Sequence, residues 1–471
     1  MKTSPTKALG LLSLFLLASP SFAVVRLPAI ISDHMVLQRS PKVPVWGWAD
    51  PQETVTVKIG NQTRTTRAGA DGRWQVDLDL VAAPRAATTL TVNGDGNAIV
   101  VNDVLVGEVW LASGQSNMQR SLDQTNDGKQ AIAAADHPDI RLFKVDRKKF
   151  TRPQNDVKGE WVVCTPDSIA KTKFSAAAYY FGRKLKEELS APVGMIDSTW
   201  GGTQIQLWTP VQQPDDSAGT ETRKNDPSTI YNGMISGLAP YGMRGVIWYQ
   251  GESNIIAGEE GPGYTVMMET LVSSWRAKWQ ADFPFYYAQV APHLYHVVRD
   301  KFVKDSQAAP RMWEAQAQAL RIPNTGMIVT TDLVDNLRDI HPLDKLSVGL
   351  RFANLALAYT YGKSGIATYG PVFRKLSVKG GKAILSFDFA DGLASRDGEP
   401  LNWFEIAGSD GNYHPANAVI EQNRVVVSSP DVPNPATVRF AWDESAQPNL
   451  VNKAGLPALP FRSDHPLPPV R

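Results

Sequence analysis

The feature that most constrains the fold is an alternation of apolar strands and helical stretches between residues 104 and 362. Apolar runs that end in glycine or polar residues lie at 192–202, 243–254, 283–292 and 324–335. The stretches with helical spacing are 176–189, 264–279, 312–320 and 346–362. Strands and helices that alternate in this way predict an α/β domain, with a parallel sheet covered by helices on both faces.

The two flanks of this region have a different pattern. Residues 24–103 and 363–471 contain short alternating runs, such as VPVWGW (43–48) and TVRFAW (437–442), separated by turn residues. This pattern is typical of antiparallel β modules. Either two β modules flank the α/β domain, or one jelly-roll-like β-sandwich carries the domain as an insertion. We favour the insertion, because chain ends that lie close together make it easy.

Residues 1–23 have the features of a secretory signal peptide. Lys2 and Lys7 give a basic start, 8–18 is an apolar run, and 21–23 reads as a small-x-small cleavage site. The apolar run is too short to span a bilayer comfortably. We therefore expect a protein that is exported to the periplasm or secreted, without membrane insertion.

Composition narrows the function classes. The net charge is +1 and no long basic run occurs, which argues against nucleic acid as a partner. The chain holds 13 Trp, 13 Tyr and 16 Phe; many must be core residues, but exposed aromatic faces also suit sugar rings. Cys164 is the single cysteine, so no intrachain disulfide can form. We expect it to be a buried small hydrophobe rather than a nucleophile.

Four strands of the expected sheet end in unusual polar or glycine-rich loops. They are SGQSN (113–117), GG (201–202), QGESN (250–254) and DIHP (339–342). Each could be a turn, a packing glycine, a helix cap or a loop histidine. In open parallel sheets, however, ligands bind beyond the carboxyl ends of the strands. Their joint occurrence at strand ends therefore predicts an active site.

The residue types in these loops suit acyl transfer. A serine such as Ser116 is a weak nucleophile unless a base takes its proton, and that base is normally a histidine. Of seven histidines, His341 is best placed, just before the last helix of the α/β region. A carboxylate should orient its ring. Asp339 is nearest in sequence, with Asp335 and Asp332 behind it.

The oxyanion formed by serine attack needs fixed N–H donors. The candidates are the backbone N–H of Ser116, the backbone N–H of Gly201 or Gly202, and the side-chain amide of Gln250 or Asn254.

Four sequence blocks carry a resemblance to a known family. The blocks are GEVWLASGQSNM (107–118), DSTWGGTQIQLWTP (197–210), VIWYQGESN (246–254) and DIHPLDKLSVGLRFA (339–353). The sequence resembles SGNH (GDSL-like) hydrolases, and more closely the sialate O-acetylesterase family, including in both flanks. The resemblance implies a flavodoxin-like three-layer domain within or beside a β-sandwich. It also implies removal of O-acetyl groups from a carbohydrate substrate, with no metal or organic cofactor.

Carried over by position, Ser116 is the nucleophile, His341 the base and Gly202, or its neighbour Gly201, the glycine donor. Arg338 stands where the family has Asp, three residues before the histidine. Either Asp339 replaces that residue, or a backbone carbonyl orients the ring in a dyad.

A second departure concerns the amide donor. Ser253 stands where SGNH hydrolases have a strict Asn. We therefore expect Gln250 to be the amide donor, with Asn254 as the second candidate.

Aromatic and polar residues around the loops are the candidate sugar contacts: Trp200, Gln204, Trp208, Trp248 and Glu252. Glu252 could instead brace its loop or be a surface carboxylate. Sialate esters are one substrate class, and acetylated xylan or xyloglucan is the alternative. A non-catalytic sugar-binding protein is a further reading, although Ser116 and His341 are both intact. A cysteine or metal hydrolase is disfavoured, because there is one Cys and no metal-ligand spacing.

Overall fold

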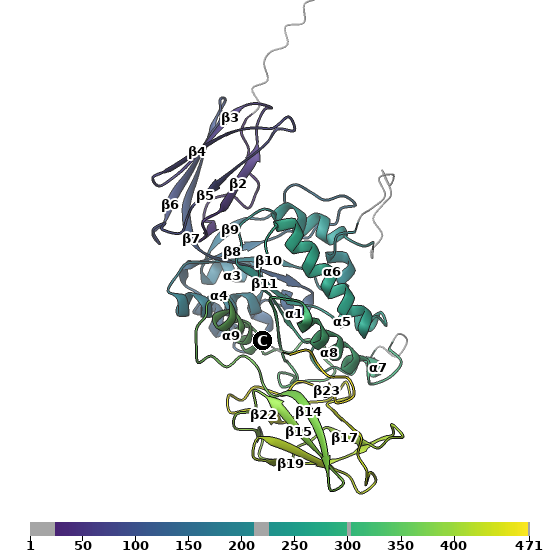
Figure 1. Cartoon of the computed structure of the whole chain (residues 1–471). Helices are drawn as coiled ribbons and strands as arrows, with labels where there is room; N and C mark the ends of the chain where they lie inside the picture. Colours follow the sequence, from purple (N-terminus) through teal and green to yellow (C-terminus); the bar gives the residue numbers. More distant parts are fainter. Residues whose placement is uncertain (1–23, 212–225, 299–302, 470–471) are drawn as a thin grey trace, which may run out of the picture.

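The structure is a computed structural model that describes residues 24–211, 226–298 and 303–469 (Figure 1). The expected signal peptide, 1–23, lies outside the described residues.

A mostly parallel sheet forms the centre of the molecule, in the order β13-β12-β11-β7-β10-β8-β9. Neighbouring strands run parallel except β8 and β9. The strands are β7 (Ala98–Gly114), β8 (His137–Lys144), β9 (Trp161–Cys164), β10 (Val193–Thr199), β11 (Gly245–Tyr249), β12 (Phe285–Ala288) and β13 (Thr325–Ile328). The predicted α/β sheet is confirmed. Numbered along the chain, its parallel strands have the order 2-3-1-4-5-6, which differs from the flavodoxin order 2-1-3-4-5.

Helices cover both faces of this sheet (Figure 1). On one face α4 packs against α9, and on the other α6 packs against α8. The helices are α1 (Ser116–Gln119), α2 (Gly128–Ala133), α3 (Pro166–Thr172), α4 (Ala176–Leu189), α5 (Glu252–Ile256), α6 (Pro262–Trp279), α7 (Tyr295–Val298), α8 (Ala308–Gln318) and α9 (Lys345–Leu355). The starts of α4 and α9 follow ordinary capping rules: Ser175 caps α4, and Asp344 caps α9 by accepting the N–H of Ser347.

The N-terminal β module is joined to the central sheet by one continuous strand. Its strands are β1 (Val36–Gln38), β2 (Val43–Trp48), β3 (Thr54–Ile59), β4 (Gln62–Arg67), β5 (Arg73–Leu78) and β6 (Thr88–Asn93). The first part of β7 pairs with β6, and the second part pairs with β10 and β11. The boundary expected between 103 and 104 therefore falls inside a strand. Burial is mixed before it and complete after it.

The C-terminal β module lies at the opposite end of the molecule (Figure 1). Its strands are β14 (Val372–Lys379), β15 (Lys382–Asp388), β16 (Ala394–Ser395), β17 (Phe404–Ala407), β18 (Tyr413–Pro415), β19 (Asn417–Glu421), β20 (Arg424–Ser428), β21 (Thr437–Phe440), β22 (Leu450–Val451) and β23 (Phe461–Arg462). In the described part of the chain, none of them pairs with a strand of the N-terminal module. The favoured insertion is therefore wrong, and two β modules flank the α/β domain.

Candidate active site at the strand ends

Ser116 follows the central strand through a turn that requires glycine. Gly114 has φ +128°, and a Cβ there would lie 2.2 Å from the carbonyl oxygen of Tyr249 on β11. The next residue, Gln115, donates its N–H to the same carbonyl at 2.9 Å. Helix α1 then begins at Ser116, so this residue lies in a first helical turn, where backbone N–H groups have no intrahelical acceptor.

His341 reaches Ser116 from the loop that follows β13. Its Nε2 lies 2.9 Å from Ser116 Oγ, and its Nδ1 lies 3.1 Å from Asp339 Oδ1. The same carboxylate oxygen accepts the backbone N–H of His341 at 3.0 Å. Both ring contacts are within hydrogen-bond reach. In this arrangement the imidazole can take the proton of the serine hydroxyl while the carboxylate orients the ring.

The other carboxylates considered for this role lie elsewhere. Asp332 Oδ2 bonds Arg351 Nη2 at 2.6 Å, and Asp335 is exposed. The geometry thus brings Asp339, and not these two, to the histidine ring.

The electrostatics of the pair favour a neutral imidazole. Burial and the nearby charge of Arg120 lower the pKa of His341 below its ordinary value, against the opposing effect of Asp339. Burial alone would raise the pKa of Asp339, but hydrogen bonds from His341 and the charges of His341 and Arg120 lower it overall. The histidine is therefore in its proton-accepting form near neutral pH.

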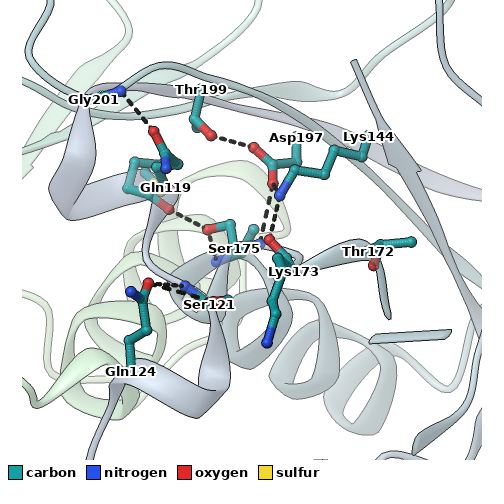
Figure 2. Close-up of polar contacts among 12 residues, drawn as sticks. Gln119, Ser121, Gln124, Lys144, Thr172, Lys173, Ser175, Asp197, Thr199 and Gly201 are labelled. Carbon is teal, nitrogen blue, oxygen red and sulfur yellow. Dashed lines mark hydrogen bonds and ion pairs between the residues drawn. The ribbon is translucent and has the colours of Figure 1, made fainter. Parts of the chain in front are cut away.

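The glycine pair after β10 lies against Ser116. A Cβ on Gly201 would lie 3.2 Å from Ser116 Cβ. The N–H of Gly201 donates to Gln119 Oε1 at 2.6 Å (Figure 2). Gly202 has φ +70° and open space around it, and among the described residues its N–H has no acceptor. Of the two N–H groups, that of Gly202 is the one left for a ligand.

The buried carboxylate of Asp197 connects the segments that carry the serine turn and the glycine pair. Asp197 accepts hydrogen bonds from Thr199 Oγ1 at 2.6 Å and from the Ser175 N–H at 3.1 Å, with Lys144 Nζ at 3.4 Å (Figure 2). The Ser175 hydroxyl in turn donates to the carbonyl of Met118 at 2.6 Å. Helix α1, the start of α4 and the end of β10 are thereby held together.

The amides expected to serve as oxyanion donors are directed elsewhere. Gln250 Nε2 bonds oxygens of Gln115, Thr203 and Asn254 at 2.7–3.2 Å. Asn254 Nδ2 donates to Gln206 Oε1 and to Glu259 Oε2. Both side chains are fully buried. Neither amide hydrogen-bonds to Ser116 or His341. Their bonds instead connect the loop at 250–254 to the residues that follow the glycine pair at 201–202.

The candidate sugar contacts divide into two groups. Trp208 and Trp248 are 0% and 1% exposed and pack edge-to-face on each other, so neither ring offers a face to a ligand and their prediction as sugar contacts is wrong. Trp200 is half-buried, with Lys149 Nζ 5.6 Å from its ring centre. Gln204 is also half-buried and donates to Glu259.

Glu252 is buried and not on the surface, with 1% of the residue exposed. Its Oε1 accepts a hydrogen bond from Asn117 Nδ2 at 2.5 Å. Glu252 therefore braces its loop, which was the alternative role, and its buried carboxylate is out of reach of a sugar. Asn117 also binds Lys345. The roles of Asn117, Gln119 and Lys345 were missed, although Asn117 and Lys345 lie inside the sequence blocks quoted above and Gln119 directly follows the first block. The sequence signal that could have pointed to a role for Lys345 is the spacing of charged residues at the start of α9.

Neither a reactive cysteine nor a metal site is found among the residues that the structure describes. Cys164 is buried, as expected, and burial raises the pKa of its thiol to about 12. Within 24–211, 226–298 and 303–469, no three His, Cys, Asp or Glu side chains are grouped so that they could hold a metal. The helices of the same ranges include none that is long and apolar enough to cross a membrane.

The known proteins that are similar to this chain are carbohydrate esterases. The fold is similar to that of XAC1771, described as a novel carbohydrate acetylesterase from Xanthomonas citri. The TM-score is 0.85 at 37% identity, over 93% of this chain and 99% of that one. Sialate O-acetylesterase of Rattus norvegicus is 27% identical over 93% of both chains. The Homo sapiens enzyme of that name is 30% identical over 82% of this chain and 81% of its own.

The family model for the carbohydrate esterases described as sialic acid-specific acetylesterases matches residues 106–358. This range contains all four strand-end loops and more than half of the chain. The chain therefore belongs to this family of carbohydrate esterases, and it is an esterase.

Proposed function

We propose that the chain is a serine esterase that removes O-acetyl groups from carbohydrates through an acetyl-enzyme. The observation that carries the proposal is the continuous contact Ser116–His341–Asp339, at 2.9 and 3.1 Å. In this mechanism His341 Nε2 takes the proton of Ser116 Oγ as the oxygen attacks the acetyl carbonyl. The same proton then leaves on the sugar hydroxyl, and water releases acetate by the reverse sequence of proton transfers.

The oxyanion would be bound by the backbone N–H groups of Ser116 and Gly202. Support for Ser116 comes from its place in the first turn of α1. Support for Gly202 comes from its N–H, which has no acceptor among the described residues, whereas that of Gly201 is bonded to Gln119. Each such donor is typically worth about 10²- to 10³-fold in kcat.

The substrate class is a sugar ester rather than a lipid. Trp200 and Gln204 offer one half-buried ring and one polar side chain close to the glycine pair. Sialate esters are favoured by the names of the curated relatives. Acetylated xylan or xyloglucan oligosaccharides are the second candidate, because the similar Xanthomonas citri protein is described only as a carbohydrate acetylesterase.

The test is acetate release from O-acetylated sialic acid and from acetylated xylo-oligosaccharides, beside 4-nitrophenyl esters from acetate to octanoate. We expect acetate to be the preferred acyl group and one sugar class to be preferred. Ser116→Ala and His341→Ala should each lose roughly 10⁴-fold or more in kcat while keeping the wild-type circular dichroism spectrum. Preference for octanoate, or no release from any acetylated sugar, would contradict the proposal.

Export is part of the proposal. The basic start, apolar run and cleavage site within 1–23 support removal of this segment after Ala23. N-terminal sequencing of the exported protein should begin at Val24; recovery of the uncut chain from the cytoplasm alone would contradict it.

A further inference from the structure

Three polar side chains from three different elements are buried together beside the Ser116–His341 pair. Asn117 comes from α1, Glu252 from α5 and Lys345 from α9, and each residue is 1% exposed. Lys345 Nζ donates to Asn117 Oδ1 at 2.7 Å, and Asn117 Nδ2 donates to Glu252 Oε1 at 2.5 Å. The asparagine amide thus connects a buried ammonium to a buried carboxylate.

The same amide also joins the two halves of the proposed catalytic pair. Asn117 is the neighbour of Ser116, and its Nδ2 donates to the backbone carbonyl of Ile340 at 3.0 Å. Ile340 is the neighbour of His341. One side chain therefore links the backbone of the serine turn to the backbone of the histidine loop, in parallel with the 2.9 Å contact between Ser116 and His341.

Burying an ammonium and a carboxylate is costly unless both are paired or hydrogen-bonded. Burial lowers the pKa of Lys345 to about 7 and raises that of Glu252. The aromatic ring of Tyr249 lies under the ammonium, 5.4 Å from Nζ to the ring centre. The chain retains this costly group at the reaction centre, whereas an apolar side chain would fill a core at lower cost.

We propose that Lys345 is a positioning residue that acts through Asn117 to hold the serine turn and the histidine loop in register. The lysine fixes the amide of Asn117, and the amide fixes the carbonyl that precedes His341. This inference rests on the proposed function, because it requires Ser116 and His341 to be the reacting pair. Small displacements of reacting groups are expensive, roughly 10²-fold in rate for about 1 Å.

The test compares Lys345→Met, Asn117→Ala and the double variant in the full chain, with 4-nitrophenyl acetate as substrate. Each single variant should lose roughly 10²-fold in kcat, with KM changed by less than about threefold. The double variant should lose no more than the worse single variant, because the lysine acts through the asparagine. Lys363→Met is the matched control. It removes a lysine–glutamate pair with Glu188, at 3.2 Å, and should keep wild-type kcat.

Melting temperatures and assays well below them separate positioning from loss of fold. If Asn117→Ala does not fold, Asn117→Ser is the smaller change and should show the same loss of kcat. A folded variant at position 117 or 345 with kcat within about threefold of wild type would overturn the inference, as would losses that multiply in the double variant. Full activity of Ser116→Ala would instead overturn the proposed function, so the two failures are distinguishable.

Discussion

At the scale of single residues, Asp339 decides whether the site is a triad or a dyad. Its carboxylate contacts the His341 ring at 3.1 Å and also accepts the backbone N–H of that residue. Its side chain is nevertheless 46% exposed, unlike the buried aspartate of the best-known triads. Because the carboxylate accepts a hydrogen bond from Nδ1–H of His341, it holds the tautomer in which Nε2 is free to accept the serine proton.

Asp339→Asn should therefore lower kcat by about 10²- to 10⁴-fold, toward the lower end because water can partly replace an exposed carboxylate. Steady-state hydrolysis of 4-nitrophenyl acetate measures the loss. Asp335→Asn, at an exposed aspartate of the same loop, is the matched control and should stay at the wild-type rate. An Asp339→Asn enzyme within a few-fold of wild type would instead favour the dyad.

The lowered pKa of His341 gives a pH prediction with a definite sign. A base must be deprotonated to act, so kcat/KM should rise with pH through the pKa of His341, below its ordinary value of about 6.5. Since the charge of Arg120 contributes to this lowering, Arg120→Met should move the acid limb to higher pH. Arg374→Met, at an arginine on the C-terminal module with a 71% exposed side chain, should leave the limb in place. A limb that moves to lower pH in Arg120→Met would contradict this account.

At the scale of elements, the site depends on how tightly β7 turns against β11. The predicted helices correspond to observed ones, because apolar periodicity and caps are local signals. The direction in which a side-chain amide points, by contrast, is not set by the local sequence. Gln250 and Asn254 were reasonable oxyanion donors by position, yet the amide of Gln250 donates to the Thr203 carbonyl and that of Asn254 donates to Gln206, which lie 47 and 48 residues away in the sequence. Trp208 and Trp248 were predicted as sugar contacts from residue type and from their position beside the loops, and these two signals cannot distinguish a buried core ring from a ring that binds sugar.

Gly114→Ala should destabilise the fold by at least about 2 kcal/mol, because it adds a Cβ at 2.2 Å from a carbonyl oxygen to an unfavourable φ. Gly258 also has positive φ, at +72°, but no heavy atom lies within 4 Å of its Cβ position. Gly258→Ala therefore measures the backbone strain alone, about 1–2 kcal/mol. Urea unfolding of both variants gives the comparison; equal losses would show that the β7–β11 contact is not close.

At the scale of the whole molecule, the sequence predicted the α/β sheet, the strand ends that meet at the site, and two β-rich flanks. It did not predict that β7 runs without a break from the N-terminal module into the sheet. The hydrophobic patterns of the two parts of β7 differ because only the second part is buried on both faces. The sequence also favoured a single β module. In the described part of the chain, however, the C-terminal strands pair with one another and not with the N-terminal strands, and it is the N-terminal module that pairs with β7. Which chain segments meet across a molecule is set by long-range packing, and neither propensity nor periodicity encodes it.

The most direct measurement of the central claim is the site at which a serine-reactive phosphate ester labels the protein. Diethyl 4-nitrophenyl phosphate should inactivate the esterase with one label per chain, and digestion with mass spectrometry should find that label on Ser116. His341→Ala should be labelled far more slowly, because the hydroxyl then lacks its base. A label on any other residue in the inactivated enzyme, or full activity of a chain labelled at Ser116, would contradict the account.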